Sequence, residues 1–348
     1  MTSDAPGWEA IDAALDRRYP GVEPKHYATL VKWSLGGPDP LDGISFYARE
    51  SPVPHWHIVS YGMSELYSAP NPDAEWSGWG YEFTFRVRRA PGETTPPVWA
   101  ANLLQNLARY NFGSGNGFAP YQQMDLNGPI ALEYQTLIRA VAFVEDPELG
   151  VIDTPFGKVR FLQIFGLTLD EYAATQTWSV EAVLGLASGH APLFVTDLGR
   201  GSFTDIPAFA GKVAAGRRRD GSSTGSLAVA EFAWMPDGDG FRLVVGAHAV
   251  ERIAAILRGR LRFGRTLVVD GPDSSVEFSS GSYALRADGD RDPSRLKIVL
   301  TDEALDHLTG VLVPLAGVSP VPEAPGLIVD VRPTLIRDSD GNVVERIG

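Results

Sequence analysis

The chain lacks cysteine altogether, which excludes disulfide bonds and thiolate chemistry. It also lacks any segment close to the ~20 apolar residues of a membrane-spanning helix, and its N-terminus has no charged and apolar targeting pattern. Positive charge is scarce, because 30 Lys and Arg residues face 43 Asp and Glu, a net charge of −13. This balance disfavours binding to a phosphate backbone. We therefore expect a cytoplasmic protein with no nucleic-acid or membrane partner.

Catalytic and cofactor motifs are missing as well. No G-x-S-x-G elbow occurs, and the glycine-rich GSGNG segment follows a predicted helix and has no lysine, unlike a phosphate loop. His55 and His57 would share one face of a strand, as two metal ligands do, but Glu65 is the one further ligand nearby, so we favour structural histidines. Acidic pairs such as Glu145 and Asp146 could serve acid/base chemistry. We expect no enzyme, no cofactor and no metal.

Aromatic residues, by contrast, are concentrated between His55 and Arg88. This stretch holds Trp56, Trp76 and Trp79 together with the alternating strand pattern GYEFTFRVRR. Such density is typical of a buried core. The sequence predicts two strands here, HWHIVSYG and GYEFTFRVRR, around which the first domain is built.

The other elements of the first domain follow from periodicity and turn residues. In PPVWAANLLQNLARYNF, Leu103, Leu107 and Tyr110 fall on one helical stripe, so we expect Tyr110 to face inward. Hairpin strands are expected in VIDTPFGKVRFLQIFGLT, turning at Pro155 to Gly157. The remaining expected elements are a helix over 7–19, strands over 27–37 and 44–49, and a helix over 167–187.

A change in composition predicts two domains. The segment RRRDGSSTGS at 217–226 has no large apolar side chain and is the expected linker between an N-terminal domain (1–216) and a C-terminal domain (227–314). The first 216 residues carry 24 acidic and 14 basic residues, so the acidity is concentrated there. Residues 315–348 are expected to form a proline-rich tail that could contain a hairpin around Asp340 and Gly341. The predicted fold class is mixed α/β, with each domain a mixed or mostly antiparallel sheet packed with helices.

In the C-terminal domain, the segment LRGRLRFGRTLVV is interpreted as a strand. Leu257 would then lie on one face, with Arg258 and Arg260 on the other. These arginines could bind phosphate or an acidic peptide, or could form a solvated sheet face. A helix is expected to start at the capping residue Thr301.

Several of these strings together resemble the suppressor of fused family. The matching motifs are GGPDPLDGISFY, HWHIVSYGMSELY, GYEFTFRVRR, PPVWAANLLQNLARYNF and DTPFGKVRFLQIFGLT, and in the second domain LRGRLRFGR and LKIVLTDE. The resemblance runs from about Trp8 to Val313. It implies two α/β domains that close on an extended peptide of a zinc-finger transcription factor and hold it as an added strand.

The resemblance also implies binding residues. Tyr110 matches a groove tyrosine of the family, Gln122 stands near the position of an acidic groove residue, and Leu257 aligns near an apolar groove residue of the second domain. Together with Arg258 and Arg260, these are the predicted partner-binding residues. The absence of a carboxylate at Gln122 puts the animal partner in doubt.

The resemblance leaves two kinds of protein partner open for an expected monomer. Short loops and the lack of a long insertion suggest a bacterial member, which by analogy would be an immunity protein that neutralises a toxin; an acidic first domain would suit a basic toxin. The alternative is a cytoplasmic scaffold that sequesters a regulatory protein through a short linear peptide. The tail could also fold back as a strand into the protein's own groove and inhibit binding.

Overall fold

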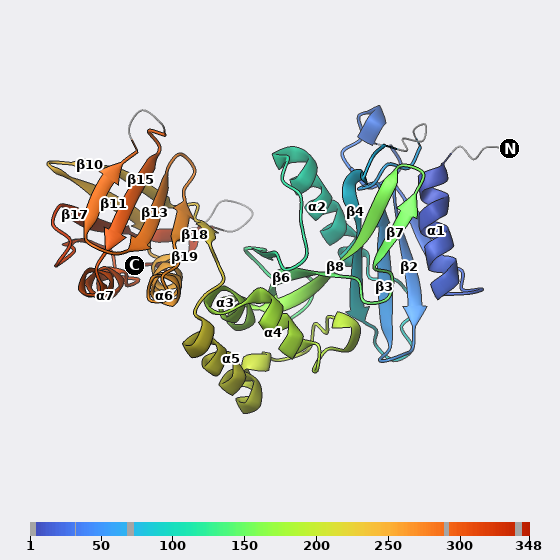
Figure 1. The fold of residues 1–348 in the computed structure, drawn as a ribbon. Helices are drawn as coiled ribbons and strands as arrows, with labels where there is room; N and C mark the ends of the chain where they lie inside the picture. Colours follow the sequence, from blue (N-terminus) through green and yellow to red (C-terminus); the bar gives the residue numbers. More distant parts are fainter. Residues whose placement is uncertain (1–4, 32, 68–72, 289–291, 338–342) are drawn as a thin grey trace. The chain divides into compact units, whose positions relative to one another are not determined.

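The computed structural model describes residues 5–31, 33–67, 73–288, 292–337 and 343–348 and confirms the predicted mixed α/β fold (Figure 1). The chain divides into two compact units. The first unit comprises Met1–Tyr172 and Leu184–Phe209, and the second unit Ala173–Val183 and Ala210–Gly348. Within the described ranges, no helix is long and apolar enough to cross a membrane.

An eight-stranded sheet forms the centre of the first unit. Its strands run in the order β1-β2-β3-β4-β8-β6-β5, and β7 pairs with β8 outside this path. β4 and β8 are parallel, whereas the other neighbours are antiparallel. The strands are β1 (Lys25–Ala28), β2 (Gly43–Arg49), β3 (His55–Tyr61), β4 (Trp76–Arg88), β5 (Gln123–Asp125), β6 (Ile138–Glu145), β7 (Val151–Thr154) and β8 (Gly157–Thr168).

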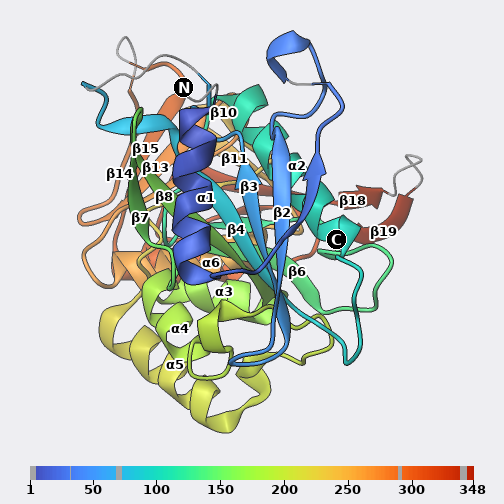
Figure 2. The same cartoon turned by 90° about the vertical axis from the view of Figure 1, so that its right-hand side faces the viewer.

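Two helices, α1 (Pro6–Arg18) and α2 (Val98–Ser114), cover opposite faces of this sheet (Figures 1 and 2). Ile11 of α1 packs in one hydrophobic cluster with Tyr47. The adjacent residue on β2, Phe46, belongs to a second cluster with the buried side of α2. Because successive side chains of a strand point to opposite faces, both faces are filled. This explains why the central strands are buried along nearly their whole length.

The segment 27–37, predicted as a strand, differs in the structure. The strand β1 ends at Ala28, and a 3-10 turn, η1 (Trp33–Leu35), follows. Leu30 is 102% exposed, so its apolar side chain does not pack in the core. The prediction was wrong because it took apolar residues as evidence of a buried strand.

Helices follow the last strand of the first unit. The predicted helix over 167–187 is divided into two, because Ser179 accepts a hydrogen bond from the Ala182 amide on its Oγ at 3.3 Å and starts a new helix. The helical elements are α3 (Leu169–Thr177), α4 (Val180–Ala187), η2 (Pro192–Phe194), η3 (Phe203–Asp205) and α5 (Pro207–Asp220).

The second unit contains a four-stranded, a five-stranded and a two-stranded sheet, and the helices α6 and α7 follow within it after the end of α5. The four-stranded sheet has the order β10-β11-β17-β16, the five-stranded sheet β14-β15-β13-β12-β9, and β18 pairs with β19. The elements are β9 (Ser226–Ala228), β10 (Phe232–Asp237), β11 (Gly240–Gly246), α6 (Val250–Leu261), β12 (Leu267–Asp270), β13 (Ser275–Ser280), β14 (Ala284–Ala287), β15 (Arg295–Leu300), α7 (Asp302–Val311), β16 (Gly317–Pro320), β17 (Leu327–Arg332), β18 (Thr334–Arg337) and β19 (Val343–Ile347).

The segment interpreted as a strand around Leu257 is the end of helix α6. Ile253, Leu257 and Leu261 are buried at a spacing of four residues, which is the period of a helix. The alternation of Leu and Arg from Leu257 onward matches the period of a strand. Only a longer segment that includes Ile253 shows the four-residue period of the helix. By contrast, Thr301 caps α7 as predicted, and its Oγ1 accepts a hydrogen bond from the Ala304 amide at 3.1 Å.

The expected linker and tail are largely ordered structure. Residues 217–220 form the last turn of α5, and β9 starts at Ser226. In the expected tail, β17 lies inside a sheet, parallel to β11, with Leu327 and Val329 buried. β18 and β19 pair as antiparallel strands, and the turn expected at Asp340 and Gly341 lies outside the described residues. The functional division into domains stays a prediction.

Candidate functional site

The first candidate surface lies at the end of α2. Gly115, with φ 75°, takes the left-handed conformation that ends this helix, and the chain then returns over it. Tyr110 is 44% exposed, so the prediction that it faces inward was wrong. Its ring stacks on Phe118 with the centroids 5.6 Å apart, and Phe118 in turn stacks on Phe143 of the sheet at 4.3 Å. Tyr110 is therefore the exposed end of an aromatic stack that starts in the core.

Gln122 belongs to the same surface. Its Oε1 accepts a hydrogen bond from the Ala119 amide at 3.1 Å, and this closes the turn that follows Phe118. Its backbone oxygen accepts the amide of Phe143 at 2.9 Å. Two of the predicted binding residues, Tyr110 and Gln122, thus flank one loop.

This loop leads into β5, an outer strand of the eight-stranded sheet. Met124 lies opposite Val141 of β6, and the amide of Leu126 donates to the Arg139 carbonyl at 3.0 Å. In an antiparallel pair, backbone groups alternate between the partner strand and the other side. The backbone N–H and C=O of Asp125 therefore point away from β6. Across the described ranges, no strand pairs with this outer side of β5.

Exposed apolar side chains surround this edge. Tyr121 is 49% exposed, and the connection from β5 to β6 exposes Leu132 by 87%, Tyr134 by 49% and Leu137 by 59%. Tyr134 also contacts Trp99 at the start of α2, with ring centroids 6.1 Å apart. Isolated exposed apolar residues are ordinary, but several around one open strand mark an interaction surface.

The three predicted residues of the second unit differ from one another. Leu257 is fully buried in the core, so its side chain offers no surface to a partner. Arg260 donates to the Ser222 carbonyl at 3.1 Å and to the Thr266 carbonyl. Arg258 is exposed and makes no hydrogen bond or ion pair with the residues the structure describes. Their roles in binding stay predictions.

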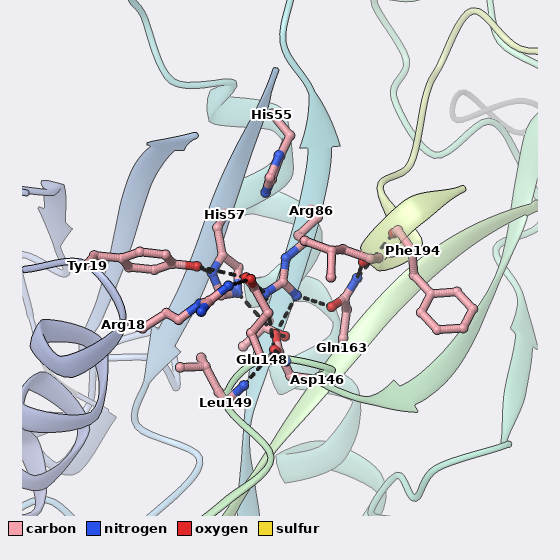
Figure 3. Close-up of polar contacts among 12 residues, drawn as sticks. Arg18, Tyr19, His55, His57, Arg86, Asp146, Glu148, Leu149, Gln163 and Phe194 are labelled. Atoms are coloured by element: carbon pink, nitrogen blue, oxygen red, sulfur yellow. Dashed lines mark hydrogen bonds and ion pairs between the residues drawn. The ribbon is translucent and has the colours of Figure 1, made fainter. Parts of the chain in front are cut away.

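A second candidate site is a buried polar network inside the first unit (Figure 3). Arg86 donates to both carboxylate oxygens of Asp146, at 2.6 and 3.1 Å, and also to Glu148 at 2.9 Å. His57 lies 3.1 Å from Asp146 through Nε2 and 2.5 Å from the Tyr19 hydroxyl through Nδ1. Figure 3 shows these side chains converging from α1, β3, β4 and the segment after β6.

The protonation of this network follows from its contacts. Burial, followed by the charge of Arg86, lowers the pKa of His57 to about 4, so the ring is neutral at pH 7. Since a carboxylate only accepts, Nε2 carries the proton toward Asp146, and Nδ1 accepts from Tyr19. Burial opposes ionisation of Asp146, but its cationic and hydrogen-bonding partners outweigh burial and hold the pKa of Asp146 below its ordinary range. With His57 neutral, Arg86 is the cation that pairs with Asp146.

This network has the groups of a catalytic site but not the access. His57 and Arg86 are 0% exposed and Asp146 is 2% exposed, so a substrate does not reach them in this structure. Their donors are directed at acceptors of the same network, including Glu148 and Gln163, except for the buried Nε of Arg86, which has no hydrogen-bond partner among the described residues. The arrangement fixes α1 and the segment after β6 to the sheet, and it supports the interpretation of His57 as a structural histidine.

Metal binding finds no support either. His55 is buried, and its Nδ1 lies 2.7 Å from the Val53 carbonyl. In the part of the chain that the structure describes, no group of three or more His, Cys, Asp or Glu residues could hold a metal ion.

Sequence reasoning missed the network around Arg86. A signal was present, because Glu82, Thr84 and Arg86 alternate with the aromatic residues of β4, and a strand buried on both faces must satisfy such polar groups. Glu82 shows this: it is buried, and its Oε1 accepts the amides of Gly62 and Ser64 at 3.0 and 2.9 Å. Its distant partners are not identifiable from the sequence.

Comparisons with known proteins agree with the predicted resemblance. Residues 37–201 match the family model "Suppressor of fused protein (SUFU)". The human Suppressor of fused homolog is 36% identical over 246 residues, which cover 66% of this chain and 50% of the relative; the mouse protein matches to the same extent. The chain thus spans about half the length of the curated relatives it matches.

Solved structures extend the match. The crystal structure of Drosophila Suppressor of Fused superimposes with a TM-score of 0.75 over 94% of this chain and 97% of its own, at 22% identity. A chain of the Sufu–Fu complex crystal structure is 30% identical and superimposes with a TM-score of 0.57. The match covers 98% of that chain and 62% of this one. On these motifs, this fold and these matches, the chain belongs to the suppressor of fused family.

Proposed function

We propose that this protein is a non-enzymatic binding protein that adds an extended segment of a protein partner as a strand to the outer side of β5. The observation that carries the proposal is the open edge of β5, where the backbone groups of Asp125 point away from β6. Main-chain hydrogen bonds at such an edge supply affinity for an extended peptide. They do not depend on the sequence of the peptide, so selectivity requires side-chain contacts beside the edge.

The exposed aromatic stack supplies one such contact. Tyr110 is held by Phe118 and therefore presents a rigid ring next to the loop that enters β5. Rigid aromatic residues contribute strongly to protein interfaces because little side-chain entropy is lost on binding. Tyr121 and Leu137 add apolar surface on the same strand connections. We infer that the bound segment carries apolar residues on the face that meets these side chains.

Two kinds of partner fit this proposal. The net charge of −13 favours a basic partner, as expected for an immunity protein that neutralises a basic toxin. A relative crystallised as a Sufu–Fu complex supports a scaffold that holds another protein, and in the alternative to a toxin this protein is a regulatory one. Competition separates them, since a short peptide should displace a regulatory partner held by a linear segment, whereas a toxin bound through its folded surface should resist. The capture of a segment between two domains, and cytoplasmic location, stay predictions.

The edge is tested by one substitution and its matched control. Peptides are first selected against the wild-type protein from a random display library, and their affinities are then measured for Asp125→Pro and Asp125→Ala. Proline removes the outward N–H that would donate to the added strand, yet leaves the bonds to β6 in place. Alanine removes the same carboxylate and keeps the N–H. We expect binding to be lost in Asp125→Pro and kept in Asp125→Ala; equal binding by both would exclude strand addition at β5.

The aromatic contact is tested in parallel with Tyr110→Ala. Its control is Tyr27→Ala, because Tyr27 is also 44% exposed but lies on β1, at the other end of the sheet. We expect about tenfold weaker peptide binding for Tyr110→Ala, which corresponds to about 1.4 kcal/mol, and no change for Tyr27→Ala. The opposite ranking would move the binding surface to β1.

A further inference from the structure

A group of arginines gathers in the second unit where α5 ends and α6 ends. We call Arg260 and Arg265, whose guanidinium groups meet at this point, together with Arg217 and Arg219 of the last turn of α5, the arginine cluster. Arg265 donates from Nη1 to the carbonyls of Asp220 and Ser222, at 2.8 and 3.1 Å, and Arg260 donates to the same Ser222 carbonyl at 3.1 Å. Two guanidinium groups thus converge on one oxygen. Their mutual repulsion is notable in a chain whose net charge is −13.

Little negative charge balances this cluster. The carboxylate that contacts it is Asp220, which takes both hydrogen bonds of the Arg219 fork, at 2.7 and 2.6 Å, and also accepts the Trp178 Nε1–H at 2.9 Å. Among the described residues, no carboxylate forms an ion pair with Arg217, Arg260 or Arg265. Asp220 is therefore the one carboxylate among the described residues that forms an ion pair with the cluster.

Capping of the helix ends explains part of this arrangement. Arginines near a helix C-terminus commonly donate to its last carbonyls, as Arg265 does to Asp220. Capping uses a single nitrogen of Arg265, however. Its Nε and Nη2 make no hydrogen bond to the described residues, and these two atoms form the edge that binds a carboxylate with two parallel bonds. Arg217 is exposed and uses none of its donors on the described residues.

An aromatic ring contacts the same short segment as Arg265. Phe263 is 38% exposed, and its ring would meet a Cβ built on Gly221 at 2.5 Å, so it rests directly on the residue that follows α5. The glycine is required there, since its φ is also positive, at 65°. The surface thus combines unused guanidinium donors with an exposed apolar ring.

We propose that the arginine cluster binds an acidic segment of a protein partner, rich in Asp or Glu and carrying an apolar residue for Phe263. A carboxylate matches the free edge of Arg265 in shape and charge. A peptide is favoured over a nucleic acid because the cluster is compact and the rest of the chain is acidic, and long polyanions are repelled by that surrounding charge. This surface belongs to the second unit and is independent of the binding proposed at β5.

The test uses the full chain and a fluorescently labelled Glu-rich peptide that contains one leucine. Affinity is measured by anisotropy for the wild type, for Arg217→Gln with Arg265→Gln, and for Lys212→Gln with Arg286→Gln as the matched control. Lys212 of α5 and Arg286 of β14 are exposed and have no hydrogen-bond or ion-pair partner among the described residues, so their loss also removes two positive charges but leaves the cluster intact. We expect about tenfold weaker binding for the double variant and less than about a twofold change for the control.

Two further measurements keep the outcome decisive. Arg265→Lys retains the charge but loses the two-nitrogen edge, so it should bind more weakly than the wild type and more tightly than the double variant. Arg217→Gln removes no contact, and it tests the cluster if the double variant is poorly folded by circular dichroism. Absence of peptide binding, an equal loss in Lys212→Gln with Arg286→Gln, or tighter binding of a single-stranded oligonucleotide or of inorganic phosphate would each overturn the proposal.

Discussion

Arg86 of β4 and Asp146, which follows β6, are 60 residues apart in sequence and form a two-nitrogen ion pair with both side chains fully buried. The pair also holds Glu148, which lies 2.9 Å from Arg86. A buried pair of this kind is costly to form but more costly to break, because the remaining charge stays buried without a counter-ion. The stability of the first unit should therefore depend on Arg86.

Replacing Arg86 with methionine should therefore destabilise the protein by about 3–5 kcal/mol. The matched control is Arg88→Met on the same strand, since Arg88 is 55% exposed and pairs with Asp197 at 2.9 Å. An exposed pair contributes less than about 1 kcal/mol. Chemical denaturation of both variants checks the difference, and similar midpoints would show that the buried pair is not needed for stability.

Stability should also fall in mild acid because of His57. Burial lowers the pKa of His57 to about 4 in the folded protein, below its ordinary value of 6.5, so unfolding takes up a proton between these values. A lowered pKa means that the contribution is complete above pH 6.5 and is lost as the pH falls toward 4. The slope from one such group reaches about 1.4 kcal/mol per pH unit.

Glu82 acts in the opposite direction, because burial raises the pKa of its carboxyl, so its contribution is present at low pH and is lost as the pH rises. The measurement is therefore the difference in slope between the wild type and His57→Gln over pH 4 to 6.5. The variant should show the shallower slope. Parallel curves would mean that His57 does not titrate with unfolding.

Neighbouring residues of α6 should respond very differently to truncation. Leu257→Ala removes a fully buried side chain from the core and should cost about 2–5 kcal/mol. Arg258→Ala changes an exposed residue without a partner in the described chain and should alter the free energy of unfolding by about 0.5 kcal/mol or less. Thermal or denaturant unfolding tests this difference. If a Leu257 variant loses partner binding, its folding must be measured as well, because the loss can result from a destabilised core.

The turn between β7 and β8 requires glycine. Gly157 has φ 104°, and a Cβ there would lie 2.6 Å from the Ala74 carbonyl oxygen. Gly157→Ala should destabilise the protein by more than about 1 kcal/mol. Gly92→Ala is the control, since φ is 76° there but nothing lies within 4 Å of the added Cβ. Equal melting temperatures would show that the turn yields to the methyl group.

Deletion of residues 315–348 should unfold the second unit and not activate it. β17 is an internal strand between β11 and β16, so its loss would expose the edge of β11 and remove buried Leu327 and Val329. Deletion of 334–348 removes the β18–β19 pair and keeps β17. Circular dichroism and proteolysis should find the shorter deletion folded and the longer one not. A folded longer deletion with tighter partner binding would instead support autoinhibition by this segment.

Local sequence patterns were sufficient to predict the elements whose burial follows one regular period along the segment. The strands β3 and β4, helix α2, the turn at Pro155 to Gly157 and the cap at Thr301 follow from periodicity, turn residues and hydrogen-bonding side chains a few residues apart. The family motifs likewise lie within these continuous segments.

Only the tertiary structure decided which faces are covered. It made the segment around Leu257 a helix, since the buried face was set by Ile253 and Leu261 and not by the alternating Leu and Arg. It left Tyr110 exposed on the stack of Phe118, and it joined Arg86 to Asp146. The physical reason is that burial and pairing depend on residues far apart in sequence, which the period of a single segment does not encode.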